Sequence, residues 1–283
     1  MSNSQETIRR RRPVMLAAVM VAVLLVSLGA AAWLVRARGG ELSRGVEILE
    51  HIRRKGLPSF WGDGTSRSWY LLRRQDGVAV GWRMVQRAPA AGGYIGKEIS
   101  RIGPRLHEEA WSVDVQGRLS RYRAEGSTVA RSPRSGSRLI AKTDSTRIAL
   151  RSGRVEVLRN EAGRERLGTR DAPVNYIPEG LHTLVYFLAA AGQREASFTT
   201  VFNEQSIVGN RAHFSWQRAE PQGARRVRVV FGAGEHVYQF GGNGELLRLE
   251  MPEAGLHYER VPAESVQKAF PDAPYFAQRE LRP

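Results

Sequence analysis

The chain of 283 residues contains no cysteine. This absence excludes disulfide bonds, zinc sites built on thiolates, a cysteine nucleophile and a lipid-modified cysteine. Any folded part of the chain outside the cytoplasm must therefore be stabilised by the burial of apolar surface.

Sequence motifs of common catalytic and metal centres are also missing. No serine lies in a Gly-x-Ser-x-Gly setting, and no histidines form an HxH or HExxH pair. The turn Gly241–Gly244 lacks the Lys-Ser/Thr of a phosphate-binding loop. His257, Glu259 and His213 could meet as metal ligands, but exposed histidines on strands are the simpler interpretation. We predict no catalytic centre, no metal and no cofactor, and so a protein that is not an enzyme.

The adjacent carboxylates Glu108 and Glu109 do not change this prediction. On a strand, successive side chains point to opposite faces of the sheet, which makes the two residues poor acid and base partners. We expect both to be solvated charges.

Lysine is scarce, although the formal net charge is +15. The 43 basic residues include the lysines Lys55, Lys97, Lys142 and Lys268, and the rest are arginine. An anionic partner such as lipid headgroups or a polysaccharide would explain the excess, but a compositional bias toward arginine is the simpler explanation, and we prefer it. No helix-turn-helix or base-stacking signature is present, so we expect no nucleic acid partner.

Charge is absent altogether from Val14–Val35, a run of 22 residues. A helix that spans a bilayer needs about 20 apolar residues, and this run is long enough. Arg9–Arg12 precede it, and this larger positive block predicts a cytoplasmic N-terminus. We therefore predict a single-pass protein of the bacterial inner (cytoplasmic) membrane with a periplasmic C-terminal domain.

A cleaved signal peptide is the alternative for this segment. Ala30–Ala32 supply the small residues of a cleavage site. However, the apolar run continues through Trp33–Val35, and signal peptides usually contain only about 7–15 apolar residues. We favour the uncleaved anchor.

Beyond the anchor, the apolar pattern changes from helical to strand-like. Glu41–Lys55 repeats apolar residues at spacings of three and four, which predicts an amphipathic helix. From Arg67 the pattern predicts strands, interrupted by a helix that starts at Pro178–Gly180 and ends at Gly192. We predict a cytoplasmic tail 1–13, a transmembrane helix 14–35, a stalk with the amphipathic helix 36–66, a first β-unit 67–172, a helix with a second β-unit 173–261, and a C-terminal tail 262–283.

The predicted strands are joined by tight turns at Asp76-Gly77, Gln116-Gly117 and Asn243-Gly244, where glycine accepts a positive φ. The strands are Ser68–Arg74, Val78–Arg87, Tyr94–Ile102, Ala110–Val115, Arg118–Arg123, Arg138–Leu150, Arg154–Leu158, Phe198–Phe202, Ile207–Arg218, Arg225–Phe231, Glu235–Phe240, Glu245–Met251 and Leu256–Val261. This pattern predicts a mainly β fold, with a curved antiparallel sheet or half-barrel.

Two pairs of segments suggest an internal duplication. VAVGWRMVQRA (Val78–Ala88) is similar to SIVGNRAHFSWQRA (Ser206–Ala219), and VDVQGRLSRYR (Val113–Arg123) is similar to QFGGNGELLRLE (Gln239–Glu250). A helix precedes each set, which indicates two related β-units. Repeated use of a common hairpin turn remains the alternative explanation.

The run HVYQFGGNGELLRLEMPEAGLHYERV (His236–Val261) resembles the closing hairpins of uncharacterised exported bacterial β-domain proteins. The segment NYIPEGLHTLVYFLAA (Asn175–Ala190) also fits that group. Those proteins are similar to the half-barrels of bacterial lipoprotein carriers, in which a curved sheet wraps a helix and shelters an acyl chain. The resemblance implies this fold, but it carries over no functional residue. The missing lipidated cysteine and the predicted anchor depart from a soluble carrier.

Aromatic residues within the predicted strands and second helix are the candidates for a ligand pocket. In a half-barrel, alternation directs one set of strand residues inward, and core packing is the simpler role for them. The candidate residues are Trp69, Trp82, Trp111, Trp216, Tyr186 and Phe187.

These observations predict a membrane-anchored, non-catalytic binding or structural protein outside the cytoplasm. We expect an accessory subunit of an envelope or membrane protein complex that contacts the lipid bilayer through residues 14–35. The first alternative is a tethered binder of a lipid or other apolar ligand. The second alternative is an enzyme acting on envelope polymers, which would need carboxylates or histidines clustered in a cleft.

Overall fold

A computed structural model describes residues 27, 39–40, 43–131, 138–161, 163–192, 195–200, 211–217, 225–231 and 234–278. The side chains of residues 130–141 and 211–217 fall outside this description. The predicted membrane span Val14–Val35 lies outside it as well, except for Ser27. Within the described residues, the structure contains no helix with the length and apolar character needed to cross a membrane.

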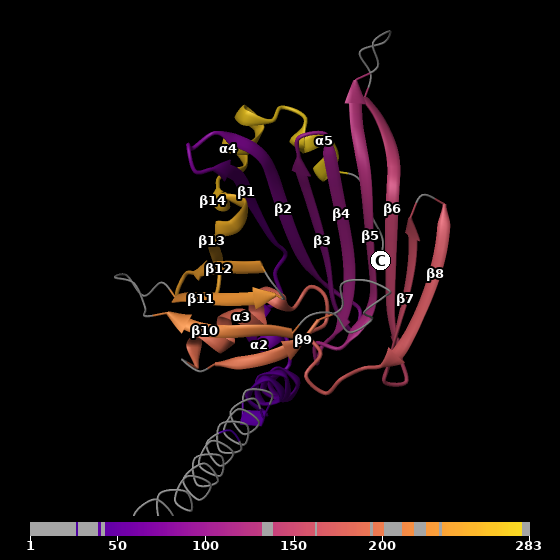
Figure 1. Ribbon diagram of the computed structural model, residues 1–283, viewed down its shortest axis with the longest axis vertical. Helices are drawn as coiled ribbons and strands as arrows, with labels where there is room; N and C mark the ends of the chain where they lie inside the picture. The colour runs from indigo at the N-terminus through magenta and orange to yellow at the C-terminus, as the bar shows by residue number, and fades with distance from the viewer. Residues whose placement is uncertain are drawn as a thin grey trace, which may run out of the picture.

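Within these described residues, fourteen strands form one antiparallel sheet in the order β8-β7-β6-β5-β4-β3-β2-β1-β14-β13-β12-β11-β10-β9 (Figure 1). This architecture confirms the predicted mainly β fold with a curved, open, antiparallel sheet. The strands are β1 Ser66–Arg74, β2 Ala79–Ala90, β3 Gly93–Ile102, β4 Arg105–Asp114, β5 Leu119–Arg131, β6 Arg138–Arg151, β7 Arg154–Glu161, β8 Arg164–Asp171, β9 Ala196–Thr199, β10 Arg211–Gln217, β11 Arg225–Phe231, β12 Gly234–Phe240, β13 Leu246–Met251 and β14 Leu256–Val261.

Strand β1 lies inside the sheet because it pairs with β2 on one side and with β14 on the other. Tyr70 and Leu72 point to the face that we call inner, and Trp69 and Leu71 point to the outer face. All four side chains are buried, so both faces of β1 are covered. A strand with two buried faces loses the apolar and polar alternation of a half-exposed strand.

Helices cover both faces. A helix over residues 43–55 and α3 (His182–Ala191) bury their apolar side chains in the inner core, whereas α4 (Ala263–Ala269) and α5 (Ala273–Ala277) pack on the outer core. Two short helices, α2 (Pro58–Trp61) and η1 (Pro252–Ala254), connect other elements. Figure 1 shows α2 and α3 beside β9–β12, and α4 and α5 near the upper ends of β1–β4.

The helix over residues 43–55 confirms most of the predicted amphipathic helix Glu41–Lys55. It lies against the domain, because an added Cβ at Gly45 would stand 2.3 Å from the carbonyl oxygen of Ser197 in β9. Leu49 and Ile52 are buried in the inner core.

Two elements differ from the prediction. Helix α3 begins at His182 rather than at Pro178, because Gly180 takes a φ of +87° that no helix allows, and the preceding residues form a turn. Strand β8 was not predicted, since its sequence RERLGTRD has almost no apolar residue. Its residues are mostly exposed, and among the described strands it pairs only with β7.

The three predicted glycine turns share one geometry. Gly77, Gly117 and Gly244 have φ of +81°, +76° and +83°. In each turn the glycine N–H donates to the carbonyl oxygen three residues earlier, and a shift of register follows in the paired strands. This geometry confirms that these glycines close β-hairpins.

On the inner face, two glycines approach the ring of Trp111 closely. Gly96 of β3 lies opposite Trp111 of β4, and an added Cβ there would stand 1.9 Å from the Trp111 ring. Gly180 approaches the same ring, and its added Cβ would stand 2.4 Å away. The indole of Trp111 therefore occupies space that two glycines leave open.

We predict that Gly96→Ala destabilises the protein by about 1–3 kcal/mol, because the methyl group would overpack the Trp111 ring. Urea unfolding of the full-length protein in mild detergent measures this loss. The matched control is Gly64→Ala, where an added Cβ meets nothing within 4 Å. Equal urea midpoints for the two variants would contradict the proposed packing.

Candidate functional site

A cavity of about 310 Å³ lies on the inner face between the sheet and α3. Strands β1–β4 form its floor, and α2, α3 and the turn between β12 and β13 form its walls. The lining residues are Phe60, Trp61, Ser66, Ser68, Tyr70, Arg83, Val85, Arg87, Glu98, Glu109, Trp111, Gly180, His182, Thr183, Leu184, Phe187, Asn243, Gly244, Glu245 and Leu246.

Cross-strand register explains why polar residues gather on the floor. Val85 lies opposite Glu98, and Glu98 lies opposite Glu109, so the two carboxylates occupy one row across β3 and β4. In the neighbouring row, Gly96 lies between Arg87 and Trp111. Because Gly96 has no side chain, it leaves space between Arg87 and Trp111 on the floor of the cavity.

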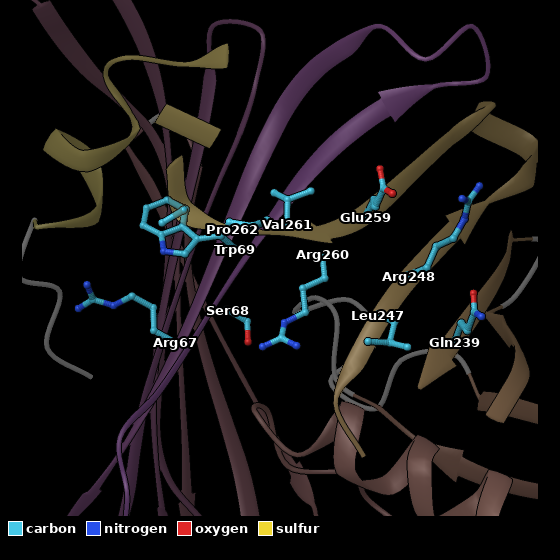
Figure 2. Close-up of a pocket in the computed structure, with 11 residues that line it drawn as sticks. Arg67, Ser68, Trp69, Gln239, Leu247, Arg248, Glu259, Arg260, Val261 and Pro262 are labelled. Atoms are coloured by element: carbon cyan, nitrogen blue, oxygen red, sulfur yellow. The ribbon is translucent and has the colours of Figure 1, made fainter. Parts of the chain in front are cut away.

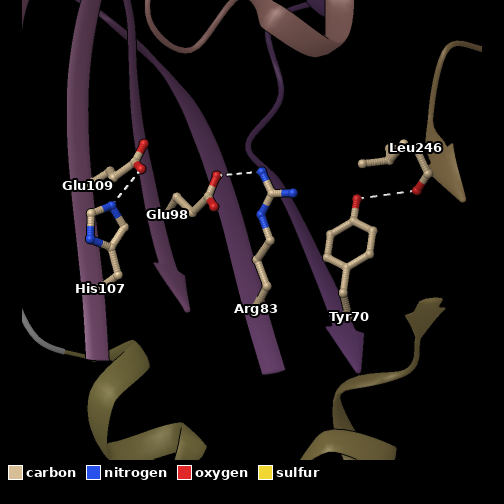
Figure 3. A network of polar contacts seen from close by, with 6 residues as sticks. All are labelled: Tyr70, Arg83, Glu98, His107, Glu109 and Leu246. Carbon is tan, nitrogen blue, oxygen red and sulfur yellow. Dashed lines mark hydrogen bonds and ion pairs between the residues drawn. The ribbon is translucent and has the colours of Figure 1, made fainter. Parts of the chain in front are cut away.

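Two ion pairs neutralise most of the charge on the floor (Figure 3). Arg83 donates from Nη2 to Glu98 Oε2 over 2.6 Å, and both side chains are largely buried. His107 Nε2 lies 2.8 Å from Glu109 Oε1. Tyr70 adds a hydrogen bond from its hydroxyl to the carbonyl oxygen of Leu246, over 3.2 Å.

Burial and pairing shift the ionisation of these groups. The hydrogen bond to Glu109 raises the pKa of His107. Burial alone would raise the pKa of Glu109, but the bond and charge of His107 outweigh it and leave that pKa lowered. Burial raises the pKa of Glu98 despite its pairing with Arg83. Burial also lowers the pKa of His182 to about 4, so this imidazole is neutral near pH 7.

Arg87 differs from the other charged residues of the floor. Its guanidinium carbon lies 4.3 Å from the centre of the Trp61 ring, which is the geometry of a cation–π contact. Its Nε is buried and has no hydrogen-bond partner among the described residues. Burial lowers the pKa of Arg87 to about 10.

A buried carboxyl group lies beside the cavity. Glu179 is 5% exposed and is hydrogen-bonded to the hydroxyl of Tyr176. Burial raises the pKa of Glu179 to about 8, so it is protonated at neutral pH. The next residue, Gly180, lines the cavity, so the hydrogen-bonded pair of Tyr176 and Glu179 lies next to the cavity wall.

A wider groove of about 820 Å³ opens where β1 ceases to pair with β14 (Figure 2). It is lined by Arg67, Ser68, Trp69, Gln239, Leu247, Arg248, Glu259, Arg260, Val261, Pro262 and Ala263. Ser68 lines the groove and the cavity, and Arg260 of the groove is ion-paired with Glu245 of the cavity. The two hollows therefore adjoin one another.

The structure separates the six aromatic residues that the sequence grouped. Trp111 and Phe187 line the cavity. Tyr186 is fully buried, and its ring packs against that of Tyr238 at 4.8 Å. Trp69 and Trp82 lie in the core of the outer face, and the side chain of Trp216 lies outside the described residues.

Sequence reasoning missed the charged lining. Arg83, Arg87, Glu98 and His182 were not predicted, and Glu109 was expected to be solvated. Glu108 and Glu109 do point to opposite faces, but Glu108 is 1% exposed and Glu109 faces the cavity, so the expectation of solvated charges was wrong. The signal in the sequence was weak: Arg83 and Arg87 lie on the same face of β2, but the adjacent charges Lys97-Glu98 and Glu108-Glu109 break the alternation in β3 and β4.

The histidines considered for a metal site lie on different strands, with His257 on β14 and His213 on β10. Among the described residues, no group of three or more histidine, aspartate or glutamate side chains is arranged to hold a metal ion. The cavity instead offers ion-pairing, hydrogen-bonding and aromatic surfaces to a small molecule.

Comparisons with known proteins add little. No protein-family model matches the chain, and a search of curated proteins finds no match. Among solved structures, a porin-like protein from Bacteroides uniformis ATCC 8492 is similar over 73% of this chain and 97% of its own, with 10% sequence identity and a TM-score of 0.16. An overlap this low carries no argument about fold or function. The resemblance to exported β-domain proteins stays a prediction.

We predict that Glu179→Gln weakens the pH dependence of stability. The folded pKa of about 8 lies above the ordinary value of 4.5, so between these values the folded state holds a proton that the unfolded state has lost. Stability should therefore fall as the pH rises through this window, and the neutral amide should remove that contribution. Urea unfolding at about pH 5, 6.5 and 8 measures the slope.

The exposed Glu165→Gln variant in β8 is the matched control and should retain the slope of the original protein. A slope unchanged in Glu179→Gln would contradict a buried, protonated Glu179.

Proposed function

We propose that this chain is a non-catalytic binding protein, anchored in the cytoplasmic membrane by residues 14–35, whose inner cavity takes up a small polar molecule in the periplasm. The cavity of about 310 Å³ carries the proposal, because charged and aromatic side chains line it together. Pockets for small ligands combine these properties: a concave shape, an apolar wall and a few placed polar groups.

The state of the charged groups favours binding over catalysis. Arg83 and Glu98 are engaged with each other, as are His107 and Glu109. A nucleophile adjacent to a free base is the usual arrangement of a covalent catalyst, and the carboxylates Glu98 and Glu109 of the lining are already paired. An enzyme acting on envelope polymers stays the alternative that Glu98, Glu109 and His182 favour, since they place carboxylates and an imidazole in one cavity.

A lipid ligand fits the cavity less well. An acyl chain laid over Arg83, Glu98 and Glu109 would remove their remaining water without replacing it by hydrogen bonds, which is costly. A ligand with its own polar groups avoids this cost. We therefore favour a polar ligand over the acyl chain that the resemblance to lipoprotein carriers implies.

Two related β-units remain part of the proposal. The turns at Gly117 and Gly244 occupy the same place in β2–β5 and in β10–β13. Each turn also touches the helix that precedes its unit: an added Cβ would stand 3.3 Å from Ile52 at Gly117 and 3.1 Å from Phe187 at Gly244. Gly77 closes a turn of the same geometry, but the described residues include no counterpart of this turn in the second unit. Repeated use of one turn type therefore stays the alternative explanation.

A subunit of a larger complex is the second candidate, and strand β8 favours it. β8 ends the sheet, and no described strand pairs with its free edge. Leu167 in its middle is 70% exposed. The free main-chain groups of such an edge can pair with a strand of another subunit.

We predict that Thr183→Phe abolishes ligand binding, because the ring would fill the cavity beside α3. Native mass spectrometry of the full-length protein in mild detergent should detect a bound small molecule in the original protein but not in this variant. The control is Thr169→Phe on the exposed edge strand β8, which should keep the ligand. An empty cavity in all three proteins would contradict the proposal.

For the second candidate, we predict that Leu167→Asp removes a protein partner from the same spectra while leaving the small ligand in place. The reason is that a charge at the centre of β8 opposes strand addition. Thr183→Phe is the control and should keep the partner. A chain that stays monomeric in every sample would contradict the complex.

A further inference from the structure

The charges around the inner cavity do not cancel completely. Among its described lining residues, Arg83 is paired with Glu98, Glu109 with His107, and Glu245 with Arg260. His182 contributes no charge near neutral pH, since burial lowers its pKa to about 4. Arg87 is the charged lining residue that this pairing leaves over.

Among the described residues, no acidic side chain is ion-paired with Arg87. Its neighbours across the sheet are Ser66 on β1 and Gly96 on β3, and neither carries a charge. The ring of Trp61 covers one face of the Arg87 guanidinium, with 4.3 Å between the guanidinium carbon and the ring centre. The Nε of Arg87 is buried without an acceptor among the described residues. A half-buried cation without an acceptor is costly, and an incoming anion would remove that cost.

We propose that Arg87 anchors an anion subsite and that the ligand of the inner cavity is a small organic anion, with a carboxylate or phosphate at Arg87 and a flat apolar body beside it. This inference rests on the proposed function, since it names the ligand class of the same cavity. Arginine suits the task because its planar fork binds carboxylate and phosphate oxygens through two parallel hydrogen bonds.

Aromatic rings supply the place for the flat body. The rings of Trp61 and Trp111 lie 5.8 Å apart and are inclined at 44°, and both line the cavity beside Arg87. Tyr94 packs edge-on against Trp61 at 5.1 Å and holds that ring over the guanidinium. Phe60 and Phe187 complete an apolar wall. A planar group can therefore contact aromatic surface while its acidic group reaches Arg87.

The test uses four probes of similar shape: benzoate, phenyl phosphate, neutral benzamide and cationic benzylammonium. Binding to the full-length protein in mild detergent is followed by calorimetry and by the fluorescence of the cavity tryptophans. The variants are Arg87→Gln, which removes the charge, and Arg87→Lys, which keeps the charge but loses the planar fork. The control is Arg105→Gln, an exposed arginine of β4 outside the cavity lining.

We expect at least one anionic probe to bind more tightly than benzamide or benzylammonium. Its affinity should fall roughly tenfold to a hundredfold in Arg87→Gln, as for the loss of a charged hydrogen bond. Arg87→Lys should recover part of it, and Arg105→Gln should match the original protein. The ratio between benzoate and phenyl phosphate then distinguishes a carboxylate ligand from a phosphate ligand.

Other outcomes overturn the inference in separable ways. If benzamide and the anions bind equally, and Thr183→Phe abolishes both, the cavity binds ligands but Arg87 does not select anions. If the anions bind Arg87→Gln as tightly as the original protein, the anion site lies elsewhere. If no probe binds any of the proteins, the inference fails together with the proposed function.

Discussion

The pairing of β1 with β14 is the constraint on which the rest of the structure depends. It joins Trp69–Arg74 to Leu256–Val261, segments from opposite ends of the folded chain, in one hydrogen-bonded ladder. Without it, β1–β8 and β9–β14 would form two separate sheets, each with an additional open edge. With it, α3 and the helix over residues 43–55 lie on a single continuous face. The fold achieves this by burial on both faces, since the chain has no disulfide.

The inner cavity follows from the same arrangement. α3 belongs to the second half of the chain and packs on β10 and β11. Its first two turns wall the cavity opposite side chains of β2–β4 from the first half, so charges that would face water in an isolated meander become enclosed. Enclosure explains why Arg83, Glu98, His107 and Glu109 occur as pairs. It also makes Arg87 exceptional, because its stacking on Trp61 supplies a contact but no opposite charge.

The fold was predictable from sequence to the extent that local chemistry specifies it. Glycines at Gly77, Gly117 and Gly244 indicated three hairpins, and the alternation around them indicated most strands. Strand β8 was missed because it buries almost nothing and carries no apolar signal. Helix α3 was started too early because Pro178 and Glu179 resemble a helix start, whereas Gly180 adopts a left-handed conformation.

The candidate site was much less predictable, because it depends on register and on coverage. Trp111 points to the inner face and Trp82 to the outer face. A shift of one residue in strand pairing would move each side chain to the opposite face of the sheet. Polar residues at alternate positions of a strand ordinarily indicate a face in water. Here Glu98 and Glu109 share one row, Arg87 lies in the next row, and all three line a cavity walled in part by a helix from a distant part of the sequence, which no local pattern reports.

The position of β1 also has a consequence for the order of folding. A ribosome produces β1 well before β14, so the middle of the sheet can be completed only when synthesis is almost finished. Until then β1 has an unpaired edge and two apolar faces, the features that promote association with other chains. Contacts this distant in sequence also form slowly. The earliest strand of the sheet therefore keeps an exposed edge and two apolar faces until the last strand of the sheet arrives.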